Sequence, residues 1–451
     1  MSAMIRDREI SPLEVVDAHL DQIARVNPEI NAFSTIFAEE ARAAARKATD
    51  AVQHGAVLGL LHGIPVTVKD SFDVAGYPTT AGSRLRLQHR AANDAAAVAN
   101  LRAAGAIVIG KTNTPDLLRS YETDNLIAGR TKNPWDTSRT PGGSSGGEAA
   151  AIAAFCSAGG LGSDGGGSIR IPAHFCGIAG LKPTPGRISS AGHFPAILNP
   201  AGMLTVAGPM ARNAQDLRML FAALAGYDPE DPFSAPVALG GPDSAGHVRV
   251  GLWKQFYGVP VDPRIAQTLQ QAANALEEIG IPTEEFTPSG LERAPNLWAL
   301  FFGRLAGRFL KDLTARREAD VHPVLLEAIE QSLKLPEPSA DDLIRAFVAR
   351  DRMRAGLLRQ MKEHQMLLTP PCSIPAFPHG FREGLFQATM NATFANLLGL
   401  PALVIPFAVS SGGLPVGIQL VGRPWEEELL LDTAARLEEV RGPFPSPPGI
   451  M

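Results

Sequence analysis

The sequence has few cysteines, no excess of basic charge and no long apolar run. Its three cysteines are an odd number and too few for a disulfide framework. The 41 basic and 46 acidic residues give a net charge of −5, so a nucleic-acid surface has no electrostatic support. No stretch reaches the roughly 20 apolar residues that span a bilayer, and no apolar core follows the N-terminal charges as in a signal peptide. These absences predict a globular cytoplasmic protein without a nucleic-acid or membrane partner.

Two kinds of cofactor motif are also missing. The ten histidines are scattered, without the His-x-x-x-His or Glu-containing spacing of a zinc site. The phosphate-loop pattern Gly-x-x-x-x-Gly-Lys-Ser/Thr does not occur. We therefore predict no metal and no cofactor. His174 and His193 lie near glycine clusters, and we interpret them as packed or surface residues.

Glycine and proline, by contrast, are abundant and clustered. The 44 glycines and 37 prolines are about 10% and 8% of the chain, against about 7% and 5% in typical proteins. Ser144 and Ser168 are each embedded in such a cluster, at 141–147 and 159–168. Glycine lets the backbone approach a reacting carbonyl and leaves N–H groups free to bind an oxyanion. Two tight turns or a phosphate loop would leave the same pattern, although the residues before the Gly162-x-x-Gly165 pattern do not read as the strand that a phosphate loop follows.

The hydrophobic periodicity predicts an α/β protein. Short apolar or β-branched runs alternate with amphipathic or alanine-rich helices, which is typical of a sheet covered by helices. Ser11 and Glu14 have the spacing of a capping box, which marks the start of the first helix. The predicted helices are 11–26, 38–53, 94–105, 148–154, 264–280 and 427–440, and the predicted strands are 63–70, 106–109, 248–253, 367–374, 402–407 and 417–421.

We predict a single domain over residues 1–451, with a catalytic core at 63–230. The texture of the sequence changes after about residue 230. We interpret the segment 236–355, helical over 297–330 and rich in exposed-looking aromatics, as a variable cap over a substrate entrance.

Lys69 is the most informative charged residue. It ends an apolar strand, where a lysine either snorkels at the sheet edge or is held in a site. Partial burial would lower its pKa, which a neutral lysine base requires. The letters of a Gly-x-Ser-x-Gly elbow occur at 142–146, but 134–141 does not read as the strand that this elbow needs. A histidine-based triad is therefore poorly supported.

The stretch from 112 to 185 resembles the amidase signature family of serine hydrolases. The matching segments are TNTP at 112–115, ETDN at 122–125, NPWD at 133–136, GGSSGGE at 142–148, GSDGGGSIRIP at 162–172 and GIAGLKPT at 177–184. Further matches are GIPVTVKD at 63–70, NLLGLPA at 396–402 and GLPVGIQ at 413–419. The similarity covers nearly the whole chain apart from about 230–360.

This resemblance implies a fold, a reaction and a triad. The fold is a large mixed β-sheet with helices on both faces and a helical cap, and the reaction is hydrolysis of carbon–nitrogen amide bonds. Lys69 matches the base, Ser144 the bridging serine after a cis Gly143–Ser144 peptide bond, and Ser168 the nucleophile. The N–H groups of the nucleophile's loop match the oxyanion hole, and they belong to Gly165, Gly166, Gly167 and Ser168.

The substrate is less specified. The family acts on amides, anilides, esters and carbamates, and we expect a broad aryl or alkyl amidase, monomeric or homodimeric. The residues expected to bind substrate are Leu118, Ser120, Tyr121, Gly143, Trp298 and Phe302. Core packing explains any one of the aromatic residues equally well. Asp164 and Arg170 are interpreted as an ion pair bracing the nucleophile's loop.

Other interpretations of the whole chain stay open at this point. One is the glutamine-hydrolysing component of a tRNA-dependent amidotransferase, although no amino-acid carboxylate-binding motif is visible. Others are a non-catalytic scaffold and a nucleotide-binding protein.

Overall fold

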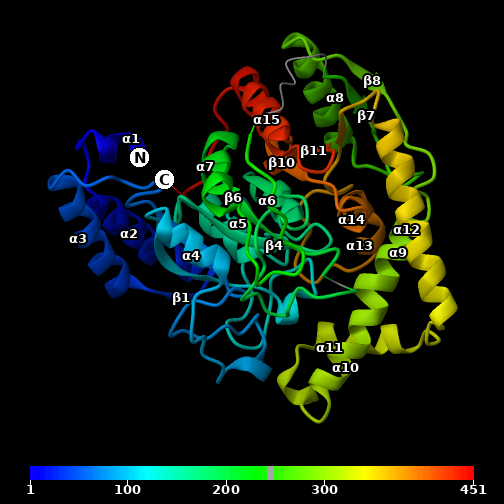
Figure 1. Ribbon diagram of the computed structural model, residues 1–451, viewed down its shortest axis with the longest axis horizontal. Coiled ribbons are helices and arrows are strands. Elements are labelled where there is room, and N and C mark those ends of the chain that lie inside the picture. The colour runs from blue at the N-terminus through cyan, green and yellow to red at the C-terminus, as the bar shows by residue number, and fades with distance from the viewer. Residues whose placement is uncertain (201, 241–247, 451) are drawn as a thin grey trace.

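A computed structural model describes residues 1–200, 202–240 and 248–450 (Figure 1). Residues 201, 241–247 and 451, which fall within the predicted domain, lie outside the described residues. Across the described ranges one sheet has eleven strands in the order β1-β3-β2-β4-β6-β5-β10-β11-β9-β7-β8. The strands are β1 (Phe33–Ile36), β2 (Pro65–Lys69), β3 (Ile107–Thr112), β4 (Gly159–Asp164), β5 (Ala179–Lys182), β6 (Val206–Ala211), β7 (Val250–Leu252), β8 (Thr283–Glu285), β9 (Met366–Thr369), β10 (Ala402–Val409) and β11 (Pro415–Gly422).

The sheet is mixed, as predicted. Strand β2 lies between β3 and β4 and is parallel to both, whereas the central strands from β4 to β9 pair antiparallel. Strands β9, β7 and β8 are again parallel to one another. Because β2 and β4 run in the same direction, the residues at their C-terminal ends lie at the same edge of the sheet.

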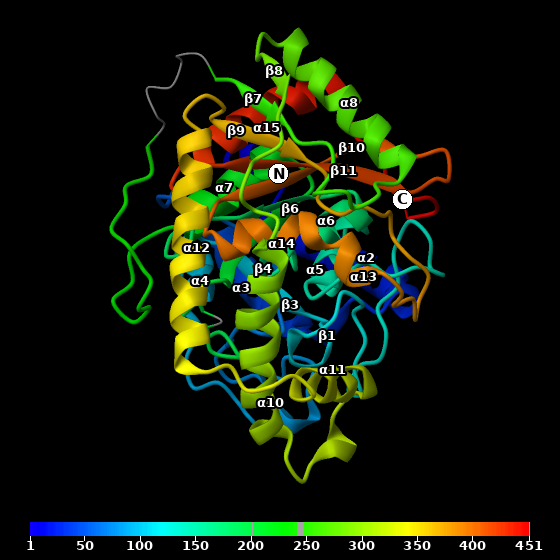
Figure 2. The same ribbon diagram turned by 90° about the vertical axis from the view of Figure 1, so that its right-hand side faces the viewer.

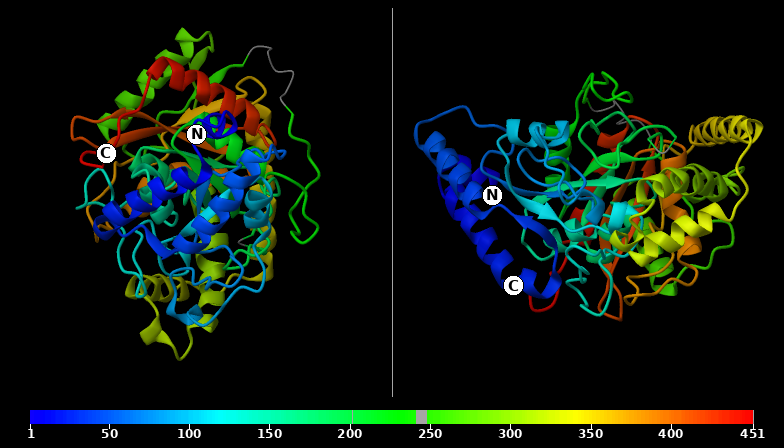
Figure 3. Two further views of the ribbon diagram at one scale, coloured as in Figure 1. Left: turned by 90° about the vertical axis from the view of Figure 1, so that its left-hand side faces the viewer. Right: turned by 90° about the horizontal axis from the view of Figure 1, so that it is seen from below.

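Helices cover both faces of the sheet, which confirms the predicted α/β architecture (Figure 3). The helices that contact one face are α4 (Ala96–Ala103), α7 (Ala214–Leu224), α8 (Pro263–Glu278) and α15 (Glu427–Arg441). Those on the other face are α5 (Gly146–Ala153) and α6 (Arg170–Cys176). Helices α1 (Ser2–Arg6), α2 (Pro12–Ile30) and α3 (Ala38–Gln53) lie toward the β1 end, and α13 (Leu385–Ala388) and α14 (Met390–Leu397) precede β10. None of the described helices has both the length and the apolar character needed to cross a membrane.

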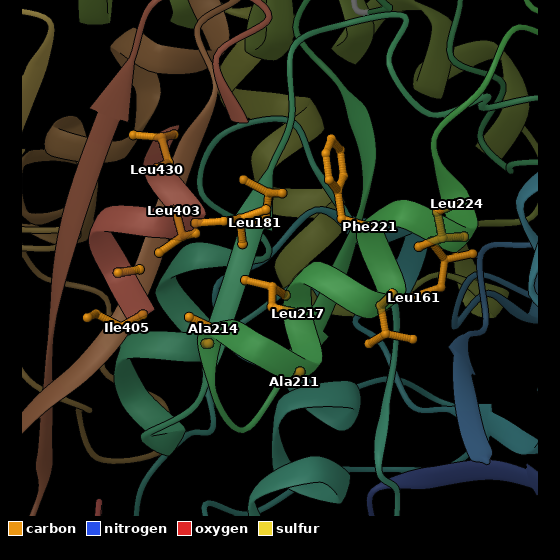
Figure 4. Packing of buried hydrophobic residues seen from close by; sticks show 14 of the residues in the cluster. Leu161, Leu181, Ala211, Ala214, Leu217, Phe221, Leu224, Leu403, Ile405 and Leu430 are labelled. Carbon is orange, nitrogen blue, oxygen red and sulfur yellow. The ribbon is translucent and has the colours of Figure 1, made fainter. Parts of the chain in front are cut away.

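Strand β10 packs against helices on both faces of the sheet. Leu403 and Ile405 pack into the core cluster that contains α7 and α15, whereas Val404 between them packs against α5 and α6. Figure 4 shows the first of these clusters, in which side chains from the sheet meet Leu217 and Leu430 of the covering helices. This alternation follows from the two-residue period of a strand that is buried on both faces.

The first long helix begins where the sequence predicts. Ser11 and Glu14 form the complete capping box, and Pro12 occupies the first helical position. The helix ends at Asn31, which adopts a left-handed conformation with φ of 51°. It is four residues longer than the predicted end at 26, since Ile30 is buried and its packing extends the apolar face.

The predicted cap has two parts. Its first part adds β7, α8 and β8 to the end of the sheet, so it is not purely helical. Its second part is an arm of helices that projects from the sheet (Figure 2). The arm comprises α9 (Ala294–Trp298), a π-helix (Ala299–Leu305), α10 (Ala306–Thr314), α11 (Pro323–Leu333) and α12 (Ala340–Gln360). The segment 297–330 is helical over most of its length, as predicted, but it is divided, because α10 ends at Thr314 and Pro323 starts a new helix.

Strand β4 is the main correction to the predicted elements. The residues before Gly162 do belong to a strand, which runs from Gly159 to Asp164, although glycine has a low preference for strands. A Cβ atom added at Gly160 would lie 2.0 Å from Glu148 Oε1 and 2.4 Å from the Thr67 carbonyl oxygen. The strand is glycine-rich because helix α5 and strand β2 approach its backbone closely.

Candidate active site

Lys69 lies at the C-terminal end of β2 with no exposed surface. Its neighbours Val66 and Val68 face the core cluster on one side of the sheet, so Lys69 points to the opposite side. The Nζ atom lies 2.7 Å from Ser144 Oγ, 3.0 Å from Ser163 Oγ and 3.4 Å from the Ser163 carbonyl oxygen. The lysine is therefore held inside the site and does not snorkel at the sheet edge.

Burial lowers the pKa of Lys69 to about 7. The nearby carboxyl groups of Asp164 and Glu148 act in the opposite direction and raise this pKa. A lysine with this pKa can carry a neutral amine near pH 7. A neutral amine has two N–H donors and one lone pair. It can therefore donate in two of its three contacts and accept a hydrogen bond in the third.

The loop that carries Ser144 opens helix α5. The Gly143–Ser144 peptide bond is cis, as the resemblance implied. A Cβ atom added at Gly143 would lie 2.5 Å from the carbonyl oxygen of Ser120, so only glycine fits this approach. Ser144 itself is 2% exposed, and its hydroxyl lies between the buried amine and the cavity described below.

The loop from Gly165 to Ser168 follows β4. The Ser168 carbonyl oxygen accepts a hydrogen bond from Ser145 N–H at 3.1 Å, which joins this loop to the one that carries Ser144. Within the described part of the chain, the backbone N–H groups of Gly165, Gly166 and Ser168 have no acceptor. Gly167 N–H is different, because it donates to Asp164 Oδ1 at 2.7 Å. The expected oxyanion donor at Gly167 is therefore already engaged, and three free N–H groups are left.

Asp164 and Arg170 form a buried ion pair with an N–O distance of 3.0 Å, as the sequence predicted. The guanidinium of Arg170 also donates to Gln419 and Asn396, and the pKa of Asp164 is held well below its usual range by this partner. Both side chains are fully buried and hydrogen-bonded to protein groups, which is how a buried charge pair is tolerated. The pair braces the loop from Gly165 to Ser168 and leaves no free charge for substrate.

Ser163 and His193 form a hydrogen-bonded pair beside Lys69. His193 Nδ1 lies 2.8 Å from the Pro195 carbonyl oxygen, which fixes the proton on Nδ1. Its Nε2 lies 3.0 Å from Ser163 Oγ and is left to accept the serine proton. Burial lowers the pKa of His193 to about 3, so the ring is neutral near pH 7. Ser163 Oγ can therefore accept from Lys69, which orients the amine.

A cavity of about 370 Å³ opens beside the serines. Ser144, Ser163 and Ser168 line it together with Gly165 and His193. The rest of the wall is mainly apolar and comes from three segments: Leu117 to Arg119, Pro195 to Pro200, and the arm residues Phe302, Leu305, Ala306, Phe309 and Leu310. Thr205 completes it. Such a volume suits a small organic substrate.

Only two of the six expected substrate-binding residues line this cavity. These are Leu118 and Phe302. Tyr121 and Trp298 lie behind the loop from Gly165 to Ser168, here called the glycine loop. Their polar atoms donate hydrogen bonds to two of its carbonyl oxygens. Ser120 and Gly143 contact each other through the backbone outside the cavity wall.

Comparison with known proteins decides the family. The Amidase family model matches residues 14–431. The chain belongs to the amidase family. The indoleacetamide hydrolase of Bradyrhizobium diazoefficiens is 34% identical over 98% of this chain and 86% of its own length. A component of the glutamyl-tRNA(Gln) amidotransferase of a Cyanothece species is 32% identical over 96% of this chain and 95% of its own length.

Solved structures give the same result. A bacterial aryl acylamidase of the amidase signature family superimposes with a TM-score of 0.87 and 25% identity, over 98% of this chain and 95% of that chain. The protein is thus an amidase enzyme with the fold of that family.

Several parts of the amidase site carry no local sequence signal. Ser163 lies in a strand without apolar alternation, and His193 was interpreted as a packed histidine. The wall from Pro195 to Pro200 joins the site only through the tertiary fold. No group of three or more His, Cys, Asp or Glu residues that could hold a metal occurs among the described residues. The three cysteines are buried and free, and burial raises the pKa of Cys372 to about 12.

Proposed function

We propose that this amidase hydrolyses aryl and alkyl amides through an acyl-enzyme on Ser168. The observation that carries the proposal is the buried amine of Lys69, 2.7 Å from a serine hydroxyl that opens onto an apolar cavity shared with Ser168. The pKa of about 7 makes the amine available as a base at neutral pH.

The proton moves inward as the carbonyl is attacked. Neutral Lys69 takes the proton of Ser144, and Ser144 takes that of Ser168 as Ser168 Oγ bonds to the substrate carbon. The carbonyl π bond breaks and its oxygen becomes an oxyanion. The free N–H groups of Gly165, Gly166 and Ser168 stabilise that charge, and one such donor is typically worth about 2.7–4 kcal/mol.

The proton then moves outward to the leaving amine. Ser144 protonates the amine nitrogen as the carbon–nitrogen bond breaks, and Lys69 returns a proton to Ser144. In the second half of the cycle water gives a proton to the same relay as its oxygen bonds to the acyl carbon. The relay returns that proton to Ser168 Oγ as the ester C–O bond breaks, and the acid is released. The residues of this chain supply every proton transfer in the cycle.

The wall of the cavity supports an apolar acyl or aryl group. Leu117, Leu118 and the apolar arm residues surround the space next to the serines. A relative named for indoleacetamide and a neighbour named for aryl acylamides fit such a pocket. Esters and carbamates fall within the proposal, since the same tetrahedral addition opens them. The proposed enzyme is cytoplasmic and acts as a monomer or homodimer.

Glutamine is the alternative substrate, because amidotransferase components are among the relatives. Its ammonium and carboxylate groups would need charged partners in the cavity. No Asp or Glu lines the described wall, and the one guanidinium, that of Arg119, donates to the Phe302 carbonyl oxygen at 2.6 Å and stacks on the Phe302 ring. This lining favours apolar amides over glutamine.

The test combines labelling with a substrate panel. A sulfonyl fluoride should label the protein at Ser168, and Ser168→Ala should abolish both labelling and release of p-nitroaniline from an anilide. Ser157→Ala is the matched control, since Ser157 is buried outside the cavity wall and its hydroxyl hydrogen-bonds Thr67 and Gly159. Undiminished anilide hydrolysis by Ser168→Ala would contradict the nucleophile. Hydrolysis of glutamine alone would favour the amidotransferase role, and no hydrolysis or labelling would favour a scaffold.

A further inference from the structure

Two side chains behind the glycine loop bind consecutive carbonyl oxygens of that loop. Trp298 Nε1–H donates to the Gly165 oxygen at 2.8 Å, and the Tyr121 hydroxyl donates to the Gly166 oxygen at 2.7 Å. Trp298 comes from α9 in the arm, 133 residues away from Gly165 in sequence. Neither side chain lines the cavity, so their contacts serve the loop and not a substrate.

The planarity of the peptide bond makes these contacts relevant to the oxyanion. In a trans peptide the C=O and N–H bonds point in opposite directions, so fixing the oxygen also fixes the N–H. The peptide between Gly166 and Gly167 is tied at both ends, by Tyr121 at its oxygen and by Asp164 at its N–H. The peptide between Gly165 and Gly166 is tied only at its oxygen, by Trp298. Its N–H, which belongs to Gly166, has no acceptor among the described residues.

We propose that Trp298 and Tyr121 are positioning residues that hold the glycine loop so that Gly166 N–H points at the oxyanion. This inference rests on the proposed function, in which that N–H is an oxyanion donor. A hydrogen bond accepted by the carbonyl also polarises the peptide and strengthens its N–H as a donor. The arm therefore contributes to the chemistry itself, in addition to lining the entrance.

Packing against the loop backbone and two aromatic rings holds the indole ring of Trp298 in place. A Cβ atom added at Gly166 would lie 2.4 Å from Trp298 Cζ2, so the ring is in contact with the loop backbone. Phe302 stacks on the indole with ring centroids 5.0 Å apart, and Phe386 lies 6.3 Å away on similar planes. A donor fixed in this way needs no reorganisation when the oxyanion forms.

The experiment compares the same substitution at two buried tryptophans. Trp298→Phe removes the Nε1 donor and keeps an aromatic ring. Trp253→Phe is the matched control, because Trp253 belongs to the same apolar cluster, is 2% exposed, and its Nε1 has no partner in the described structure. Tyr121→Phe, which removes only a hydroxyl, is the second test variant. It still tests the inference if Trp298→Phe does not fold.

The readouts separate transition-state binding from ground-state binding. We expect Trp298→Phe to lower kcat for an anilide about 10- to 100-fold, somewhat less than the about 10²–10³-fold loss for deleting an oxyanion donor, with KM changed less than about threefold. The inhibition constant of an aryl trifluoromethyl ketone, which adds Ser168 Oγ to its carbonyl and leaves an oxyanion, should rise by the same factor as kcat falls. Tyr121→Phe should change both in the same direction, and Trp253→Phe should change neither.

Equal effects of Trp298→Phe and Trp253→Phe on kcat and on ketone binding would overturn the inference. So would a loss that appears only in KM. Failure of the proposed function looks different, because the wild-type enzyme would then neither hydrolyse amides nor be labelled at Ser168.

Discussion

Replacing Lys69 by methionine should abolish turnover and make the protein more stable. Methionine keeps most of the length of the buried side chain and removes the amine. Burial lowers the Lys69 pKa from 10.5 to about 7, and one pKa unit corresponds to about 1.36 kcal/mol. The charged lysine therefore costs the fold about 5 kcal/mol below pH 7. The substitution leaves the hydroxyls of Ser144 and Ser163 without their N–H partner, which costs about 1–3 kcal/mol, so a net gain of about 2–4 kcal/mol is expected.

The pH dependence of this gain identifies its cause. Between pH 7 and 10.5 the unfolded wild-type chain binds more protons at Lys69 than the folded chain does, so wild-type stability rises with pH. Methionine has no such dependence. The advantage of Lys69→Met should be largest below pH 7 and should shrink as the pH approaches 10, as measured by urea unfolding at several pH values.

Lys182 provides a matched control. It is also fully buried, with a pKa lowered to about 7, but its Nζ contacts the Pro183 carbonyl oxygen and it lies outside the cavity. Lys182→Met should gain stability with a similar pH dependence and keep its kcat. A Lys69→Met protein that is less stable at every pH, or whose stability difference does not change with pH, would refute the reasoning.

Three more predictions concern activity. For the wild type, kcat/KM should rise about tenfold per pH unit below the Lys69 pKa of about 7 and then level off. Burial raises the pKa of Glu148 to about 7, so its carboxylate raises the Lys69 pKa only near and above neutral pH. Glu148→Gln removes that carboxylate, so the upper end of the rise should move to lower pH while the acidic limb stays in place, and an unmoved profile would contradict the assignment of the base. Phe302→Leu, which changes the cavity wall, should alter the ratio of kcat/KM between aryl and small alkyl amides by about tenfold. A proportional loss for both substrates would show instead that Phe302 only supports the fold.

The helices and strands with a strong local sequence pattern could be predicted. The capping box of α2 and the apolar, β-branched runs of β2, β10 and β11 gave elements close to those observed. Strand β4 could not be recognised from the sequence, because glycine is rare in strands. Its glycines are required by the close approach of α5 to the strand backbone.

The site divides in the same way. The sequence motifs identified Lys69 and Ser144 as site residues. In the structure Lys69 Nζ lies 2.7 Å from Ser144 Oγ. The role of Trp298 could not be read from the sequence, since its contact with the glycine loop exists only after the arm folds over the sheet. For the same reason the engaged N–H of Gly167 was counted as free, although Asp164 lies only three residues before it.

The arrangement around Lys69 also bears on how the enzyme survives its own intermediate. A neutral primary amine attacks esters, and an acyl group on Ser168 is an ester that aminolysis would turn into a permanent amide. Lys69 is fully buried and does not line the cavity, and its three polar contacts are all to Ser144 and Ser163, which do. In the proposed mechanism these two serines pass a proton on and keep the acyl carbon away from the lysine nitrogen. A relay through a bridging serine, in place of direct contact between lysine and nucleophile, would thus protect the enzyme from acylating its own base.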